Sequence, residues 1–143
     1  MQVADIQDLL ISSLQEKTDA KKVDYYFGEL SDYNKPDLGV DDLPIVLVDF
    51  KGDKESNITT QLLFNLYIVN ISFSKNKKIK KDAHLALYKL LDQIDTTLFN
   101  LDIPCKVRAS KKIFDAKIEK GYLVIFTKDV SVQITPKEIE EWN

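Results

Sequence analysis

The longest hydrophobic segment of the chain runs from Gln61 to Phe73 and predicts a β-strand, because aliphatic, β-branched and aromatic residues dominate it and it has no Gly or Pro. Alternate residues of a strand face opposite ways, and here both faces are largely apolar. One face carries Leu62, Phe64, Leu66 and Ile68, and the other carries Leu63, Tyr67, Val69, Ile71 and Phe73, interrupted by Asn65. At roughly 3.3 Å per residue, this strand would be about 40 Å long. We expect the chain to cover one face itself and a neighbouring subunit to cover part of the other.

Two segments space their apolar side chains by three and four residues, which predicts amphipathic helices. The first covers residues 2–17, and the second covers residues 82–99 with Asp82 as an N-cap or first-turn acid. The apolar stripes are Val3, Ile6, Leu10 and Leu14 in the first helix and Ala83, Leu87, Leu90, Ile94 and Leu98 in the second.

Shorter hydrophobic segments predict further strands at 23–28, 45–50 and 105–110, and a hairpin over 113–134 that turns near Gly121. Runs of strands with two separated helices are typical of the α+β class. We therefore predict a single α+β domain with a mostly antiparallel twisted sheet and two helices packed on one of its faces.

The domain is predicted to cover residues 1–134, and residues 135–143 form a tail. Residues 51–60 between two predicted strands are mostly polar and predict a loop. In the tail, Thr135 and Glu138 form a capping box, so a short C-terminal helix is expected at 136–142.

Composition narrows the class of protein. The chain has 143 residues, which suffices for one domain with a hydrophobic core. Its net charge of −3 gives no general electrostatic reason to bind nucleic acid, and no apolar run reaches the roughly 18 residues that span a membrane. The N-terminus does not have the pattern of a signal peptide, and the single cysteine, Cys105, fits a reducing compartment.

Few residues are candidates for chemistry. His84 is the only histidine and Cys105 the only cysteine, and no motif orients them toward each other as a nucleophilic pair. Asp37, Asp41 and Asp42 could bind a cation, but their spacing is not that of a calcium loop. The sequence therefore predicts no catalytic, metal-binding or cofactor-binding residues, and we do not expect an enzyme.

Two charged or aromatic features leave alternatives open. A basic loop between the long strand and the second helix is either a solvated turn or a contact with an acidic partner or a passing nucleic-acid backbone. It contains Lys75, Lys77, Lys78, Lys80 and Lys81. In the tail, Ile139 and Trp142 lie one helical turn apart, and they dock either on the parent sheet or on a partner.

The order of these elements over residues 3–134 resembles the tail terminator-like (tail completion) proteins of Mu-like phages and prophages. The resemblance begins with the helix ADIQDLLISSL, the strand VDYYFGEL and the segment LPIVLVDFKG, in which Pro44 introduces an apolar strand. It continues with LLFNLYIVNISF, the basic turn and the helix HLALYKLLDQID, and it ends with the strands KVRASKKIF and GYLVIFTKDVSVQI.

The resemblance implies a structural ring, typically a hexamer, that caps the tail tube, ends its polymerisation and presents a surface to the neck or head. It implies neither catalysis nor a cofactor. The partners would be further copies of the chain, the tube and possibly the sheath protein, and a neck or connector protein, with DNA only as a passing backbone and no membrane. The protein would assemble in the host cytoplasm and then reside at the head-proximal end of the virion tail.

Within this interpretation, the lysines of the basic loop face a partner or the ring lumen. The expected subunit-interface residues are Tyr67, Val69, Ile71, Phe73, Ile139 and Trp142. The alternatives are a head–tail connector or neck protein of similar fold, or a small module that binds an anionic partner through the Lys75–Lys81 loop.

Overall fold

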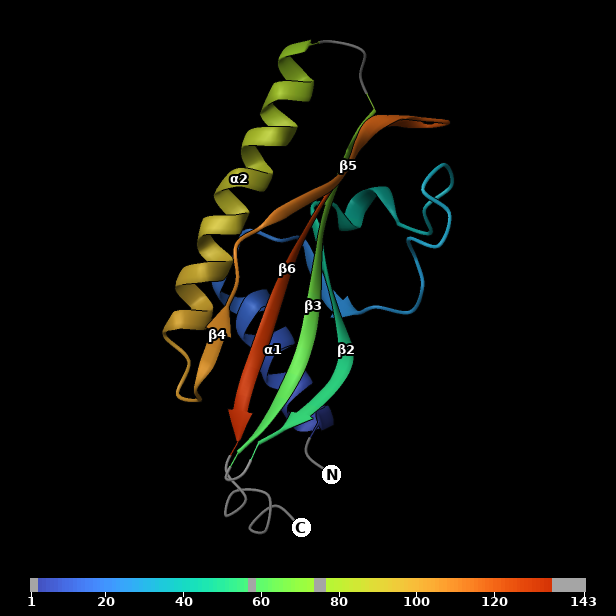
Figure 1. The fold of residues 1–143 in the computed structure, drawn as a ribbon. Helices are drawn as coiled ribbons and strands as arrows, with labels where there is room; N and C mark the ends of the chain where they lie inside the picture. The colour runs from blue at the N-terminus through green and yellow to red at the C-terminus, as the bar shows by residue number, and fades with distance from the viewer. Residues whose placement is uncertain (1–2, 57–58, 74–76, 135–143) are drawn as a thin grey trace.

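The computed structural model describes residues 3–56, 59–73 and 77–134, which form one elongated sheet with two long helices beside it (Figure 1). In chain order the elements are α1 (Val3–Lys17), β1 (Lys22–Tyr25), the 3-10 helix η1 (Val40–Asp42), β2 (Ile45–Glu55), β3 (Thr60–Ser72), α2 (Lys77–Phe99), β4 (Cys105–Val107), β5 (Lys111–Ile118) and β6 (Gly121–Ile134). Within the described ranges, neither helix is long and apolar enough to cross a membrane.

The strands form a single six-stranded sheet in the order β1-β2-β3-β6-β4, with β5 also paired to β6. Only β1 and β2 are parallel, and the other pairs are antiparallel. The short β4 lies along the last third of β6, while β5 lies along its first half, so the two strands occupy successive parts of the same edge. The predicted α+β class is confirmed, whereas the predicted C-terminal helix falls outside the described residues.

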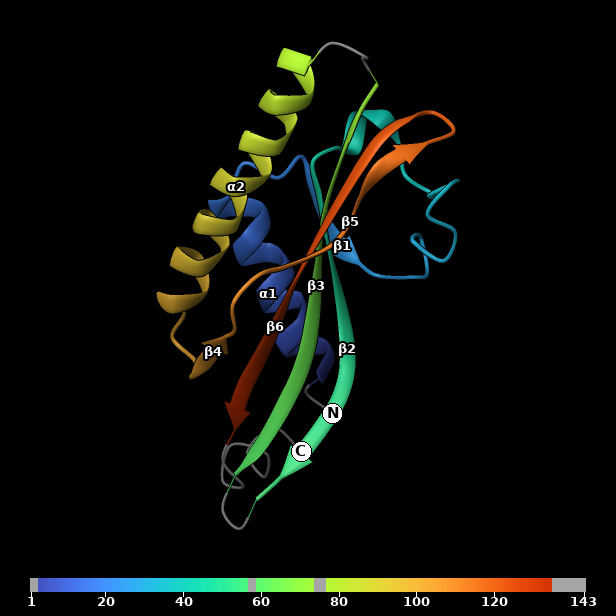
Figure 2. The same cartoon turned by 45° about the horizontal axis from the view of Figure 1, so that its top comes forward.

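The main core lies between the sheet and the two helices, which share one face of the sheet (Figure 2). The even-numbered residues of β3 point into this core, as the alternating pattern predicts. They meet Ile6, Leu10 and Leu14 of α1 and Leu87, Leu90, Ile94 and Leu98 of α2, all of them buried. The helix stripes predicted from the sequence are therefore the packed ones.

On the opposite face of the sheet, the expectation that a neighbouring subunit covers a part is wrong for the area around Val69. Around Val69, the chain covers this face itself with a second core that includes Leu30, Tyr33 and Leu38 from the segment between β1 and β2, and Phe114 from β5. Val69 is 0% exposed, so it cannot contact another subunit in this fold.

The remaining part of this second face is mostly polar. Asn65 of β3 lies between Asp49 of β2 and Asp129 of β6 in the register of the sheet. Polar side chains on a sheet face are solvated in place. Leu63, which pairs with Gly52 and Ser131, is the apolar residue of β3 on this part of the face, and it is partly buried.

Several boundaries differ from the predictions: the strands expected at 23–28 and 105–110 end at Tyr25 and Val107. Two further differences have a clear physical reason. β2 continues to Glu55 through residues predicted as a loop, because its backbone pairs with the start of β3 while its charged side chains face solvent. The register shifts by one residue before Gly52, whose φ of 132° favours glycine. In the same way, α2 begins at Lys77 and includes Asp82 in its interior, so Lys77, Lys78, Lys80 and Lys81 are helical. Lysine is a good helix former, and the macrodipole penalty at a helix start is below about 1 kcal/mol for each residue.

Candidate partner-binding surface

A hollow of about 510 Å³ opens at the end of the sheet where β3 stops and the β5–β6 hairpin turns. We call it the end hollow. Its floor is apolar and comes from three separate parts of the chain: Leu38, Val40, Ile71, Phe73 and Ile118. Val40 and Phe73 are well exposed, at 62% and 49%. Exposed apolar side chains that share one hollow are typical of a binding surface, whereas scattered single ones are not.

A second hollow of about 390 Å³ adjoins the end hollow and shares Phe73 and Ile118 with it. Its walls add Lys80 of α2, Lys117 of β5 and Tyr122 of β6. The Lys80 ammonium lies 5.0 Å from the centre of the Tyr122 ring, within the range of a cation–π contact. The two hollows together form a continuous apolar floor, and the charged residues around it are four lysines and two acids: Lys35, Lys80, Lys117, Lys120, Asp37 and Glu119.

The backbone builds this floor through a close approach at Gly121. A Cβ atom added at Gly121 would lie 2.5 Å from the carbonyl oxygen of Ser72, so only glycine lets β6 begin against the end of β3. On the other side of the hollow, the Asn34 side chain accepts a hydrogen bond from the Glu119 N–H at 3.0 Å, and Lys35 pairs with the Glu119 carboxylate at 3.7 Å. These contacts tie the loop after β1 to the hairpin turn.

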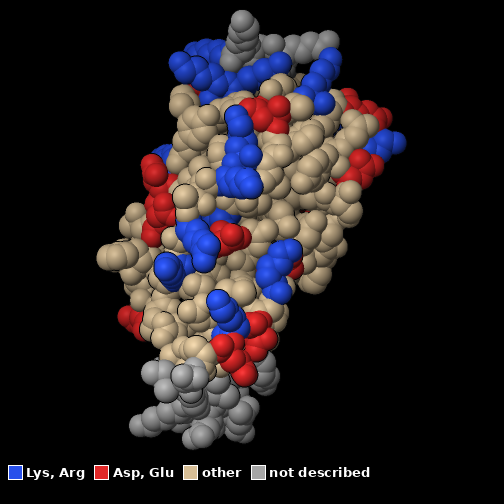
Figure 3. Space-filling model, viewed as in Figure 1, with Lys and Arg blue, Asp and Glu red and all other residues tan. Residues whose placement is uncertain are grey.

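Lysine side chains gather at this end of the molecule, where α2 begins (Figure 3). They come from the first turns of α2 and from the hairpin: Lys78, Lys80, Lys81, Lys117 and Lys120. Helix and hairpin are distant in sequence, and the fold brings them together. This end therefore carries a cluster of lysines although the whole chain has a net charge of −3.

A polar cluster beside the second hollow fastens α2 to β5. His84 Nδ1 lies 2.7 Å from the Lys80 carbonyl oxygen, so Nδ1 donates, and Nε2 faces Asp115 Oδ1 at 3.5 Å. Lys112 donates to Asp115 Oδ2 at 2.8 Å. Desolvation is the largest effect on the pKa of Asp115 and raises it, but the hydrogen bonds from Lys112 and Tyr122 and the lysine charge together lower it below its ordinary value. Both ring nitrogens of His84 face other groups, and these contacts hold the imidazole in place.

Cys105 lies far from this cluster. It pairs in register with Val132, whereas Asp115 pairs with Val124, so the two sites are eight residues apart along β6, or roughly 26 Å. Burial raises the pKa of the Cys105 thiol to about 11. The thiol is therefore protonated at neutral pH, and it forms no pair with His84.

Of the acidic loop residues, one has a charged partner. Asp42 pairs with Lys22 at 3.8 Å. In the parts of the chain that the structure describes, no group of three or more His, Cys, Asp or Glu side chains could hold a metal ion.

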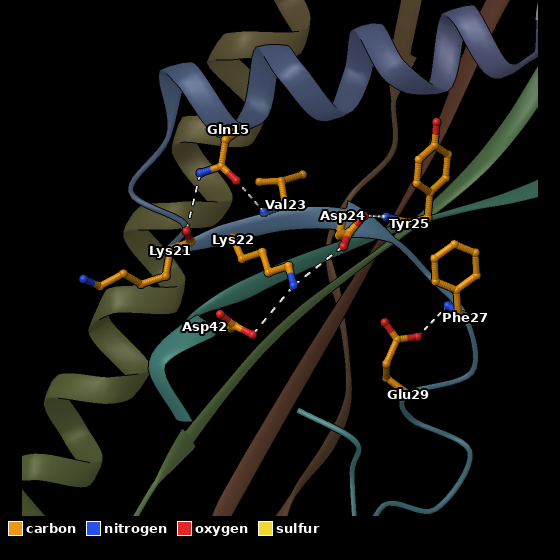
Figure 4. Close-up of polar contacts among 9 residues, drawn as sticks. All are labelled: Gln15, Lys21, Lys22, Val23, Asp24, Tyr25, Phe27, Glu29 and Asp42. Atoms are coloured by element: carbon orange, nitrogen blue, oxygen red, sulfur yellow. Dashed lines mark hydrogen bonds and ion pairs between the residues drawn. The ribbon is translucent and has the colours of Figure 1, made fainter. Parts of the chain in front are cut away.

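Side chains close the outer edge of β1, the exposed edge of the sheet (Figure 4). Oxygen atoms of Gln15, Asp24 and Glu29 accept hydrogen bonds from the N–H groups of Val23, Tyr25 and Phe27, respectively. The first two bonds are 2.8 Å long. Unpaired edge groups attract foreign strands, and these side chains occupy them. Strand addition at β1 would have to displace all three.

The structure thus divides the residues predicted to bind partners. Ile71 and Phe73 line the end hollow and Lys80 lines its neighbour, whereas Tyr67 packs on Tyr26 inside the second core, with ring centres 4.6 Å apart. Lys77, Lys78 and Lys81 lie on the same end of α2 as Lys80. Lys75, Ile139 and Trp142 fall outside the described residues. The sequence did not indicate Leu38, Val40, Ile118 and Lys117 as site residues, because no local pattern reveals that these segments meet.

No protein-family model matches this chain, and no curated protein matches it significantly. The fold and the geometry of the end hollow are therefore the observations from which a function can be inferred.

Proposed function

We propose that this protein is a structural assembly protein that joins copies of itself into a closed ring, and that the ring caps the tail tube of a phage or a phage-derived contractile tail. The observation that carries the proposal is the end hollow at one end of an elongated molecule, with the exposed apolar side chains of Val40 and Phe73 in its lining. Contact of apolar side chains with water is unfavourable in free energy, and a partner that covers them removes this unfavourable contribution.

The position of the hollow at one end of the molecule is compatible with a ring. A hollow fits a protruding surface, so the neighbour must present a different part of the same chain. When the contact is not returned across a two-fold axis, the interface is heterologous, and it closes into a ring when the rotation from copy to copy allows it. The order of elements, which resembles that of tail terminator-like proteins, supports the tail tube as the place where this ring acts.

A pair of matched variants tests the proposal. Phe73→Ser removes an apolar side chain from the floor of the hollow, and Leu85→Ser removes one of equal exposure, 49% against 48%, from the outer surface of α2. We expect tails with Phe73→Ser to lack the ring at the head-proximal end and to vary in length. Tails with Leu85→Ser should match the wild type in negative-stain images.

Circular dichroism is the control for folding in both variants. Wild-type tails without an additional ring, or tails of uniform length with a folded Phe73→Ser protein, would refute the proposal. A ring bound to the head in the absence of tails would instead identify a connector or neck protein.

The lysines at this end favour a second candidate function, which is binding to a nucleic-acid backbone. Lys80, Lys81, Lys117 and Lys120 come from two elements that meet there. If this function holds, duplex DNA should bind with an affinity that falls steeply with salt, and changing these lysines to Ser should reduce the slope. The apolar floor between the lysines favours a protein partner.

A further inference from the structure

The end hollow has a specific chemistry. Its floor is formed by Leu38, Val40, Ile71, Phe73 and Ile118, and around it and the adjoining hollow lysines outnumber acids by four to two, with Lys80, Lys117 and Lys120 on the side toward α2. A partner that fits must offer apolar side chains flanked by carboxylates. The volume of about 510 Å³ lies in the range of roughly 300–1,000 Å³ that is typical of binding pockets and exceeds what one small aliphatic side chain would fill.

The chain contains a segment with the complementary chemistry. Residues 135–143 read TPKEIEEWN, in which Ile139 and Trp142 are the apolar residues. Three carboxylates surround them, from Glu138, Glu140 and Glu141, against the one lysine of this segment. Tryptophan is among the residues most enriched as anchors in protein interfaces.

Chain length prevents this segment from reaching the hollow of its own molecule. β6 starts with Gly121 beside the hollow and runs to Ile134, a distance of about 43 Å for 13 steps of roughly 3.3 Å. Figure 1 shows that its far end lies at the opposite end of the sheet. Trp142 is eight residues beyond Ile134 and so lies at most about 29 Å from it, even in a fully extended chain.

We propose that the end hollow receives the segment 135–143 of a second copy of this chain, with Ile139 and Trp142 on the apolar floor and the glutamates facing the lysines. This inference rests on the proposed self-assembly and identifies the contact that produces it. Each copy then has its donor segment and its acceptor hollow at opposite ends of β6. This placement lets copies join head to tail, which is the arrangement that a ring requires.

Disulfide cross-linking in the full-length chain tests this contact. All variants carry Cys105→Ser, so that only introduced thiols react. The test variant adds Asp37→Cys on the rim of the end hollow and Asn143→Cys next to Trp142, which leaves the floor and the anchor intact. The control variant carries Asp92→Cys instead of Asp37→Cys. This also changes an aspartate to cysteine, but on the exposed side of α2.

After mild oxidation, we expect a ladder of dimers and larger species on non-reducing gels for the test variant and its loss in the control. Cross-linked monomers would overturn the inference, because they would mean that the segment reaches its own hollow. Equal ladders in the two variants, or no ladder in either, would also overturn it. A ring in images of wild-type tails together with no ladder would leave the proposed function standing and reject only this contact, whereas the absence of both would reject the two proposals together.

Discussion

Lys128 provides a sharp test of how the sheet is fastened to α2. Its side chain lies on the helix-facing side of β6, where it is 2% exposed, and its ammonium donates to Asp95 Oδ1 at 2.7 Å. The Asp95 carboxylate is 52% exposed. The pair therefore has one partner in the core and the other at its border. Two substitutions separate its contributions: Asp95→Asn removes the counter-charge, and Lys128→Met removes the buried charge while keeping an unbranched side chain.

The two substitutions should have unequal effects. Removing one member of a fully buried ion pair costs about 3–5 kcal/mol, and an exposed pair contributes about 0–1 kcal/mol. Because Asp95 is half exposed, we expect Asp95→Asn to reduce the free energy of unfolding by about 2 kcal/mol, between these limits. Asparagine and aspartate have similar helix propensities, so the change reports the charge. Lys128→Met removes both the attraction and the desolvation cost, and it should change stability by less than about 1 kcal/mol in either direction.

Urea unfolding followed by far-UV circular dichroism measures both variants at pH 7, together with the double variant. The double variant should be as stable as Lys128→Met, because without the lysine Asp95→Asn no longer leaves a buried charge unpaired. A larger loss for Lys128→Met than for Asp95→Asn would refute this reasoning. It would mean that the ion pair is a net source of stability and that methionine cannot replace it.

Two further predictions concern the end hollow and its neighbouring cluster. Gly121→Ala should lower the free energy of unfolding by about 1–3 kcal/mol, because its Cβ would lie 2.5 Å from the backbone oxygen of Ser72. Gly39→Ala is the control in the same thermal melts and should change it by less than about 0.5 kcal/mol, since there the Cβ meets only a side chain that can move. For Asp115, hydrogen bonding to Lys112 helps to hold the pKa below the ordinary 3.8, despite burial. Its stabilising contribution is therefore complete above the unfolded-state pKa and is lost as the pH falls through the folded-state pKa. The stability difference between wild type and Asp115→Asn should shrink below pH 3.8, and a constant difference down to acid unfolding would contradict the assignment.

Much of the fold could be predicted because its signals are local. The period of alternation over β3 and the spacing of Leu87, Leu90 and Ile94 in α2 reflect the geometry of a single element, so reading them requires no partner. The boundaries that were predicted wrongly depend on partners. The second half of β2 is polar and became a strand only because β3 offers hydrogen bonds along its full length.

The candidate surface was likewise predictable only where its signals are local. Phe73 and Lys80 were predicted to bind partners, but for separate reasons and in separate roles. They line one hollow because the β5–β6 hairpin lies beside both the end of β3 and the start of α2, and no pattern within any of these segments indicates that meeting. Val69 was predicted to face a neighbouring subunit because it is hydrophobic. The same property places it in the second core.

The sequence by itself therefore determined the class of fold, the positions of its two helices and long strands, and which residues of β3 face the helices. Periodicity encodes these features, since burial on one side of an element repeats at the period of that element. Only the tertiary structure decided that part of the second face of the sheet is covered from within the chain and that two exposed apolar residues, Val40 and Phe73, share one hollow at one end. Both outcomes depend on which distant segments pack against each other, and hydrophobicity at a single position specifies burial without specifying the partner.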